Sequence, residues 1–246
     1  MQKYTFKEHL VELKNRLLKV VCAFIIAFGV SYWLKDDIYE IFLKPLSDLS
    51  SQGGRKIIYT GLAEAFFSYI KLALFSALFI ILPVICYQIY GFISSGLKES
   101  EKKIVSSVLA FSPILFYFGA FFVFYFVMPR AWDFFLSYES SSMKIPLIME
   151  ARISEYLGLV MQLTLVFGMA FQLPIIMVIL CVIGLVDSCG LRSKRRISIV
   201  IIFIVAAIFT PPDVISQIAL AIPLMMLYET SIIMCKLVEN RTEGSK

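Results

Sequence analysis

The chain has 246 residues, of which 59% are hydrophobic and only 17% charged, with a formal net charge of +5 and 22 phenylalanines. A soluble domain is usually nearer half apolar and a quarter charged, and the charges here fall in a few clusters between long uncharged stretches. In water those stretches would expose too much apolar surface, whereas in lipid a helix satisfies its own backbone hydrogen bonds. The composition therefore excludes an ordinary soluble protein. It predicts an all-α integral membrane protein with a single membrane domain over residues 1–246.

The chain opens on a polar, charged segment, residues 1–16, that lacks the pattern of a cleavable signal. Apolar residues recur every three or four positions from Phe6 to Leu17, which predicts a cytoplasmic amphipathic helix over residues 1–16. This helix leads into the first apolar run, so targeting is expected to run through an uncleaved first span.

Hydropathy then predicts six transmembrane helices, at about residues 17–34, 72–93, 104–128, 156–186, 197–209 and 215–238. A mixed segment containing Pro45, by default a loop breaker, separates the first two. The fourth stretch is too long for one upright span. Its Gln172-Leu173-Pro174 break predicts one tilted or kinked helix, since two spans need about 40 residues.

The last two spans are predicted to be short. Residues 197–209 would cover only about 20 Å as a helix, against a hydrocarbon core of about 30 Å. A tight turn, Thr210-Pro211-Pro212-Asp213, follows before residues 215–238 return. A short hairpin of this kind implies local thinning of the bilayer.

The distribution of basic residues predicts the orientation. With six spans, both termini and the loops at 97–103 and 187–196 share one side, which carries 15 of the 23 lysines and arginines. Basic loops stay in the cytoplasm, so both termini are expected there.

The inventory of reactive residues argues against catalysis. The sequence holds no motif for nucleotide hydrolysis or intramembrane proteolysis, and His9 is its only histidine. The five cysteines show no CxxC spacing and are mostly in apolar runs, as expected for small buried residues. Neither an enzyme nor a bound cofactor or metal is predicted.

A few polar residues have two possible roles. Glu12 and Glu101 stand at cytoplasmic helix ends, either as solvated charges, with Glu12 pairing Arg16 four residues on, or as two carboxylates for a basic ligand. Gln172 lies in mid-span, where an amide serves either an interhelical hydrogen bond or the docking of another polar helix. Asp213 is placed to cap the last helix.

The segment from His9 to Leu17, HLVELKNRL, resembles the N-terminal HLxELRxR motif of the TatC family, the multispanning subunit of the twin-arginine protein translocase. Further agreement comes, in chain order, from Pro45, Phe92 with Glu101, the FQLP sequence at 171–174 and FTPPDVISQ at 209–217. Together these places cover nearly the whole chain, and the last block is the most specific.

The resemblance implies a receptor and core subunit with a concave, glove-like bundle in the bacterial inner membrane. Such a subunit binds Arg-Arg signal peptides of folded proteins at its cytoplasmic face. It assembles with single-span TatA/TatB-type subunits, and with further copies of itself, for export driven by the proton gradient. Nucleic acid plays no part.

The resemblance also assigns site residues. The implied signal-peptide-binding residues are Glu12, Glu101, Phe92, Lys14 and Arg16. Gln172 is the implied docking point for a partner helix, and Pro45, Asp213 and Gln217 match structural positions on the periplasmic side.

Two residues depart from the family pattern, because Lys14 replaces an arginine and Gln172 replaces a common glutamate. Lys14 keeps the charge but loses a bidentate contact, and Gln172 removes a titratable group. The rival hypothesis is a polytopic secondary transporter of a small molecule or ion. Such a transporter favours inverted repeats and a charged midplane site, and neither is evident in this sequence.

Overall fold

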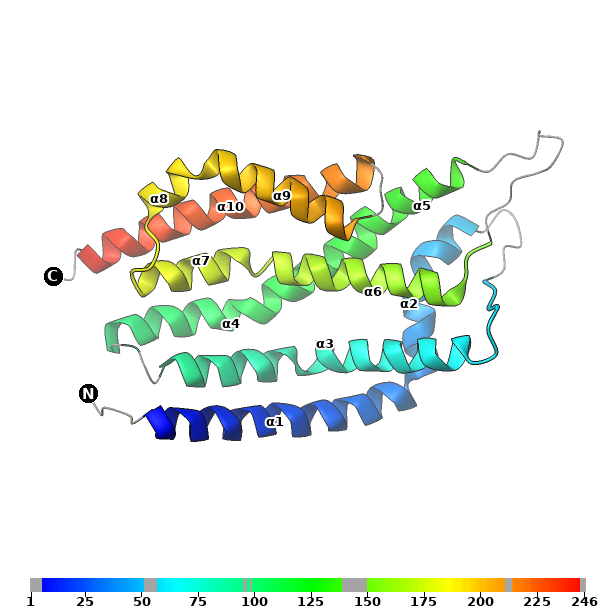
Figure 1. Ribbon diagram of the computed structural model, residues 1–246, viewed down its shortest axis with the longest axis horizontal. Helices are drawn as coiled ribbons and strands as arrows, with labels where there is room; N and C mark the ends of the chain where they lie inside the picture. Colours follow the sequence, from blue (N-terminus) through cyan, green and yellow to red (C-terminus); the bar gives the residue numbers. More distant parts are fainter. Residues whose placement is uncertain are drawn as a thin grey trace.

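The structure is a computed structural model that describes residues 6–50, 57–94, 97, 99–138, 150–210 and 214–243. Its helices are α1 (Phe6–Trp33), α2 (Lys35–Ser50), α3 (Glu64–Ser94), α4 (Glu99–Phe122), the π-helical η1 (Val123–Val127), α5 (Met128–Leu136), α6 (Ile153–Ala170), α7 (Leu173–Val182), α8 (Ser188–Ser193), α9 (Arg195–Phe209) and α10 (Val214–Glu243) (Figure 1). Within these residues the sole β-type pairing is one parallel bridge, between Ile58 and Arg152. The prediction of an all-α protein is confirmed.

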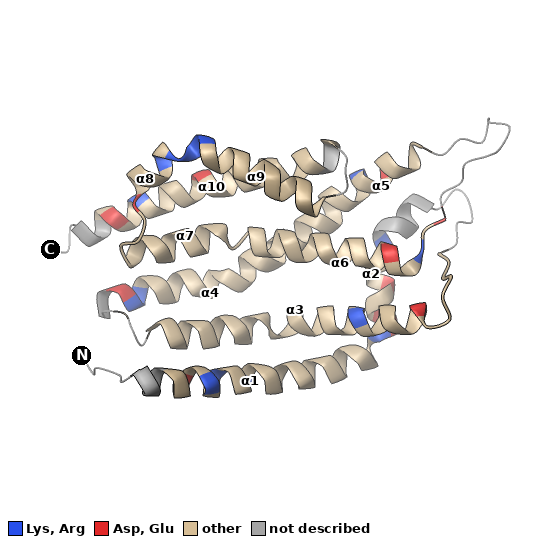
Figure 2. Cartoon of the chain, in the orientation of Figure 1, with Lys and Arg blue, Asp and Glu red and all other residues tan. Residues whose placement is uncertain are grey.

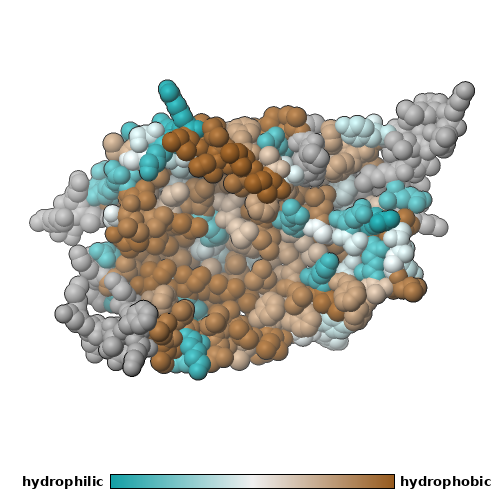
Figure 3. All heavy atoms as spheres, in the orientation of Figure 1, coloured by the Kyte–Doolittle hydropathy of each residue, from teal (hydrophilic) through white to brown (hydrophobic). Residues whose placement is uncertain are grey.

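Five helical stretches are long and apolar enough to cross a membrane: Leu10–Trp33, Glu64–Ser94, Glu101–Leu136, Ile153–Val182 and Gln217–Asn240. Apolar side chains cover the middle of the molecule in space-filling view, and hydrophilic ones gather toward its ends (Figure 3). The helix α9 has 15 residues and covers about 22 Å, less than a bilayer core of about 30 Å. A sixth span at α9 therefore stays a prediction.

The prediction of two short C-terminal spans is wrong for α10, which has 30 residues. The apolar part of this helix, Gln217–Asn240, is long enough to cross a membrane, and it nearly coincides with the predicted bounds of 215–238. The last turn of α9 and the first turn of α10 nevertheless stop short of the end of the bundle that α3 and α6 reach (Figure 1). The α9–α10 hairpin therefore falls short of the end of the bundle where α3 begins, whereas α10 extends to the opposite end (Figure 1).

The interpretation of Pro45 as a loop breaker is also wrong, because α2 continues from Lys35 to Ser50 through this residue. The turn before Pro45 is fixed by buried Phe42, whose ring packs edge-on against Phe124 and whose carbonyl accepts a 2.7 Å hydrogen bond from the Tyr156 hydroxyl. These contacts anchor the helix where proline removes one backbone bond. The Pro45 side chain lies outside the described residues.

The expected break in the fourth apolar stretch is present, since α6 ends at Ala170 and α7 begins at Leu173. Pro174 stands in the first turn of α7, where a missing N–H costs no helical bond. In contrast, α1 is continuous from Phe6 to Trp33. Residues 6–16 therefore extend the axis of the first span, and their location on the cytoplasmic side stays a prediction.

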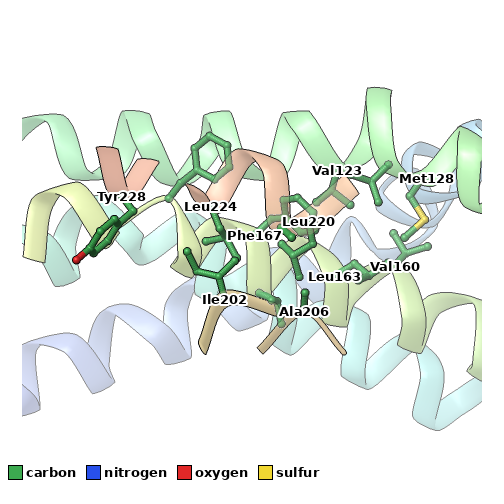
Figure 4. Close-up of a cluster of buried hydrophobic side chains, with 14 of the residues drawn as sticks. Val123, Met128, Val160, Leu163, Phe167, Ile202, Ala206, Leu220, Leu224 and Tyr228 are labelled. Atoms are coloured by element: carbon green, nitrogen blue, oxygen red, sulfur yellow. The ribbon is translucent and has the colours of Figure 1, made fainter. Parts of the chain in front are cut away.

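The largest hydrophobic cluster joins η1, α6, α9 and α10 (Figure 4). Its members include Val123, Val160, Leu163, Phe167, Ile202, Ala206, Leu220 and Leu224. The helix α1 stands apart from this cluster and packs chiefly on α3, through Ala27 against Ala77 and Ile81. Because α3 also contacts α4, it lies between α1 and α4 and sets the position of both helices.

A polar clamp closes the end of the bundle where α3 begins. The Glu64 carboxylate accepts hydrogen bonds from the Thr60 and Gly61 backbone N–H groups, at 2.8 and 3.1 Å, and from the Ser154 hydroxyl at 2.6 Å. Together with the bridge between Ile58 and Arg152, it joins the two segments that precede α3 and α6. Glu64 is the first residue of α3, and its side chain is only partly buried. The Ser154 hydroxyl, and then the backbone donors, hold the pKa of its carboxyl at about 2, well below the ordinary value.

Candidate functional site

Charged side chains gather at the two ends of the bundle, and the helices between them are mostly uncharged (Figure 2). We call the end where α1 begins, α3 ends and α4 begins the basic end; it carries Lys14, Arg16, Lys103, Arg192, Arg195 and Arg196. The first turn of α1 and the last turn of α10 lie at this end (Figure 1). Each of the five residues that the resemblance assigns to signal binding belongs to α1, α3 or α4 at the basic end.

The Glu12 carboxylate is paired with Arg16 one helical turn later. Arg16 donates from Nε and Nη2 to the same oxygen, Glu12 Oε1, at 2.9 and 2.6 Å. The two side chains are about a quarter exposed, at 25% for Glu12 and 24% for Arg16. The local ion pair that the spacing predicted is therefore present, and it is accessible from water.

The helix α3 supplies the other side of this pair. Arg16 Nη1 donates to the Gln88 side-chain oxygen at 3.3 Å, which joins α1 to α3. Gly91 lies one turn after Gln88 on α3, and the Arg16 guanidinium is so close to it that a Cβ added at Gly91 would overlap the guanidinium. Only glycine leaves this space, so Gln88 and Gly91 together form a seat for an arginine head group.

Phe92 and Glu101 belong to the same end of the bundle as this seat. Phe92 is half-buried and follows Gln88 by four residues, so both fall on one stripe of α3. Glu101 stands in the first turn of α4, where the helix dipole favours a carboxylate, and it is partly exposed. Since α3 separates α1 from α4, Glu12 and Glu101 lie on either side of it at the same end.

The structure does not bring Lys14 into this group. Two residues along a helix correspond to a rotation of about 200°, so Lys14 projects away from the stripe that holds Glu12 and Arg16. Its side chain is exposed.

Sequence reasoning missed Gln88 and Gly91 as members of the site. An amide in an apolar stretch predicts an interhelical hydrogen bond, and both Gln88 and Gln162 make one, with Arg16 and with the Phe209 carbonyl. The sequence does contain a signal for Gln88: it precedes Phe92 by four residues, so the two share one face of a helix. No sequence pattern predicts the hydrogen-bond partner of Gln88, which is Arg16, 72 positions earlier in the chain.

Gln172 lies at the break between α6 and α7 and is bonded to α4. Its Nε2 donates to the Ser112 carbonyl at 2.9 Å, and its Oε1 accepts a short hydrogen bond from the Ser112 hydroxyl. The Ser112 hydroxyl also contacts Cys86 Sγ, at 3.4 Å. The interhelical hydrogen bond is thus observed, and docking of a partner helix at Gln172 stays a prediction.

The remaining assigned residues concern the α9–α10 hairpin. Gln217 donates from Nε2 to the Phe203 carbonyl at 3.2 Å and so ties the first turns of α10 to α9. Asp213 lies outside the described residues, and its role as a cap stays a prediction. At the basic end the hairpin is closed by an ion pair of 2.6 Å between Arg195 and Glu229.

The groups at the basic end suit binding of a cation better than bond-breaking chemistry. Across the described part of the chain, no three His, Cys, Asp or Glu residues gather in a way that could hold a metal ion. The groups that contact the Arg16 guanidinium are a carboxylate and an amide, and a second carboxylate, Glu101, belongs to the same end. Carboxylates and amide oxygens accept hydrogen bonds from arginine with directional geometry.

Comparison with known proteins gives a consistent result. The model of a family described as Sec-independent protein translocase protein (TatC) matches residues 8–223. A protein of that name from Rickettsia prowazekii is 56% identical over 98% of this chain and 96% of its own length. Its namesake in Escherichia coli K12 is 36% identical over 91% of this chain and 85% of its own length.

Solved structures agree with the sequence relatives. A crystal structure described as twin arginine translocase receptor TatC in DDM superposes with a TM-score of 0.79 at 34% identity. The match covers 92% of this chain and 99% of that one.

Proposed function

Because the chain belongs to the TatC family of Sec-independent protein translocases, we propose that it is the receptor and core subunit of a twin-arginine translocase. In this proposal the basic end faces the cytoplasm of a bacterium and binds signal peptides that carry consecutive arginines. The single-span TatA/TatB-type subunits then join it for export driven by the proton gradient.

The observation that carries the proposal is the arginine seat itself. Glu12 already holds a guanidinium through two hydrogen bonds, with Gln88 as a further acceptor and Gly91 leaving the space. A site that accommodates an internal arginine has the shape and charge to accommodate one from a peptide.

Glu101 supplies the second carboxylate that a pair of arginines needs. In this proposal each carboxylate binds one of the two arginines, and Phe92 offers an aromatic face on which a guanidinium can stack. Both acids lie near the membrane surface, where the effective dielectric is lower than in water and charge attraction is stronger.

The proposal is tested by replacing each carboxylate with its isosteric amide. We expect Glu12→Gln and Glu101→Gln each to reduce photocrosslinking of an Arg-Arg signal peptide in membranes by at least about tenfold, since a hydrogen bond to a charged group contributes about 1.5–3 kcal/mol. The matched control is Glu229→Gln, which removes a carboxylate paired with Arg195 at the same 2.6 Å separation as Glu12 and Arg16. Undiminished crosslinking in both test variants would refute the assignment.

The rival transporter hypothesis receives no support from the relatives, all of the cited ones being protein translocase components. Transport of a small molecule would also need a polar site in mid-membrane. Gln172, the amide at the break in the fourth stretch, is bonded to Ser112 at both ends of its side-chain amide.

A further inference from the structure

We propose that Arg16 is a built-in competitor for the signal peptide, which occupies the Glu12 carboxylate in the resting protein and must leave before a peptide arginine binds there. This inference rests on the proposed function, because it concerns the same carboxylate. It assigns a separate role to Arg16, Gln88 and Gly91.

The first argument is that Arg16 makes the contacts that an incoming arginine would make. Its Nε and Nη2 donate to Glu12 Oε1, and its Nη1 donates to Gln88 Oε1. The acceptors of the seat are thus engaged by a residue of the chain itself. A peptide arginine reaching Glu12 meets a carboxylate that is already charge-paired.

The second argument is that two guanidinium groups cannot share the seat. Two like charges about 4 Å apart repel strongly even near a protein surface. The absence of a side chain at Gly91 leaves space for one head group only, since an added methyl group would already overlap Arg16. Binding of a peptide arginine to Glu12 therefore requires Arg16 to move.

The third argument is that Arg16 is held weakly enough to move. The ion pair spans four residues of one helix and is about a quarter exposed, and such pairs contribute only about a twofold factor to an equilibrium. The bond to Gln88 is long, at 3.3 Å. Arg16 can therefore leave for water at small cost, and it can return to Glu12 when the peptide departs.

Displacement gives Arg16 a defined effect on binding. Arg16 lowers the affinity of the receptor for its signal peptide, because separating the Glu12–Arg16 pair offsets part of the binding free energy at Glu12. It also speeds release, since the vacated carboxylate regains a partner at once. A residue that merely positioned Glu12 would have the opposite effect on affinity.

The test measures binding of a fluorescent Arg-Arg signal peptide to the purified full-length protein in nanodiscs. We expect Arg16→Gln to tighten binding about two- to fivefold, the size set by the pair that is removed. Gly91→Ala should act in the same direction while keeping the charge, because its methyl group pushes Arg16 out of the seat.

Two controls separate this effect from general causes. Lys19→Gln removes an equal charge from an exposed position of α1 and should change binding less than Arg16→Gln. Gly29→Ala adds a methyl group to α1 where nothing lies within 4 Å, so it controls for the helix propensity gained at Gly91. Thermal unfolding of Gly91→Ala establishes that the variant is folded.

The outcomes distinguish the two proposals. Tighter binding by Arg16→Gln that disappears when Glu12→Gln is also present supports the competitor role. Weaker binding by Arg16→Gln, with Glu12→Gln still abolishing capture, overturns the competitor role and leaves the receptor assignment intact. Unchanged binding by Glu12→Gln overturns the proposed function itself.

Discussion

Glu12 and Glu64 are both carboxylates that accept several hydrogen bonds, yet they stand at opposite ends of the bundle and are held by different donors. Glu64 is bonded by the backbone of Thr60 and Gly61 and by the hydroxyl of Ser154. Glu12 is bonded by the charged side chain of Arg16. Backbone donors cannot leave without unfolding a segment, whereas a side chain can rotate away. The first arrangement suits a permanent clamp and the second an exchangeable site.

The largest expected difference between the two carboxylates is in their effect on thermal stability, and it is tested at Glu64. Glu64→Gln should lower the Tm at neutral pH, because an amide oxygen accepts from the same donors less strongly than a carboxylate does. It should leave binding of the signal peptide unchanged. The wild-type advantage is fully present above the ordinary carboxyl pKa of 4.5 and is lost as the pH falls toward the folded-state pKa of about 2.

Thermal unfolding of both proteins, from neutral pH down to about 3, measures this effect. The difference in Tm should shrink steadily below the ordinary carboxyl pKa. A pH-independent difference, or an effect of Glu64→Gln on peptide binding, would break the distinction between the two ends.

Gln172 provides a smaller test, in the middle of the membrane. Gln172→Leu removes both bonds to Ser112 and should reduce co-purification of the single-span partners about threefold, since interhelical hydrogen bonds in membranes contribute about 0.6 kcal/mol on average. Binding of the signal peptide should persist. The matched control is Gln162→Leu, which removes another amide bonded to a backbone carbonyl, that of Phe209. Normal partner yield with Gln172→Leu would count against docking at this position.

The sequence predicted the helical membrane class and the break near Gln172, because both follow from local apolar patterns and from proline chemistry. It placed the last span well, at 215–238 against Gln217–Asn240, but wrongly described it as short, since 24 helical residues cover about 36 Å. It also treated Pro45 as a loop breaker, because the contacts that fix Phe42 come from η1 and α6.

The site was predicted unevenly for a related physical reason. Spacing of four residues was enough to pair Glu12 with Arg16, because both lie on one helix. The contributions of Gln88 and Gly91 depend on how α1 packs against α3, through Ala27, Ala77 and Ile81. Which face of a helix is buried can be inferred from a pattern, but the residue opposite requires the packed structure.

The central claim is that the Glu12 carboxylate directly binds an arginine of the signal peptide. A double-mutant cycle tests it, combining Glu12→Gln with replacement of each peptide arginine by glutamine and measuring all four affinities in nanodiscs. A direct contact predicts that one of the two arginines couples to Glu12 by about 1.5 kcal/mol or more, so that its replacement has little further effect once Glu12 is changed. Additive losses at both arginines, with no coupling to Glu12, would contradict the account.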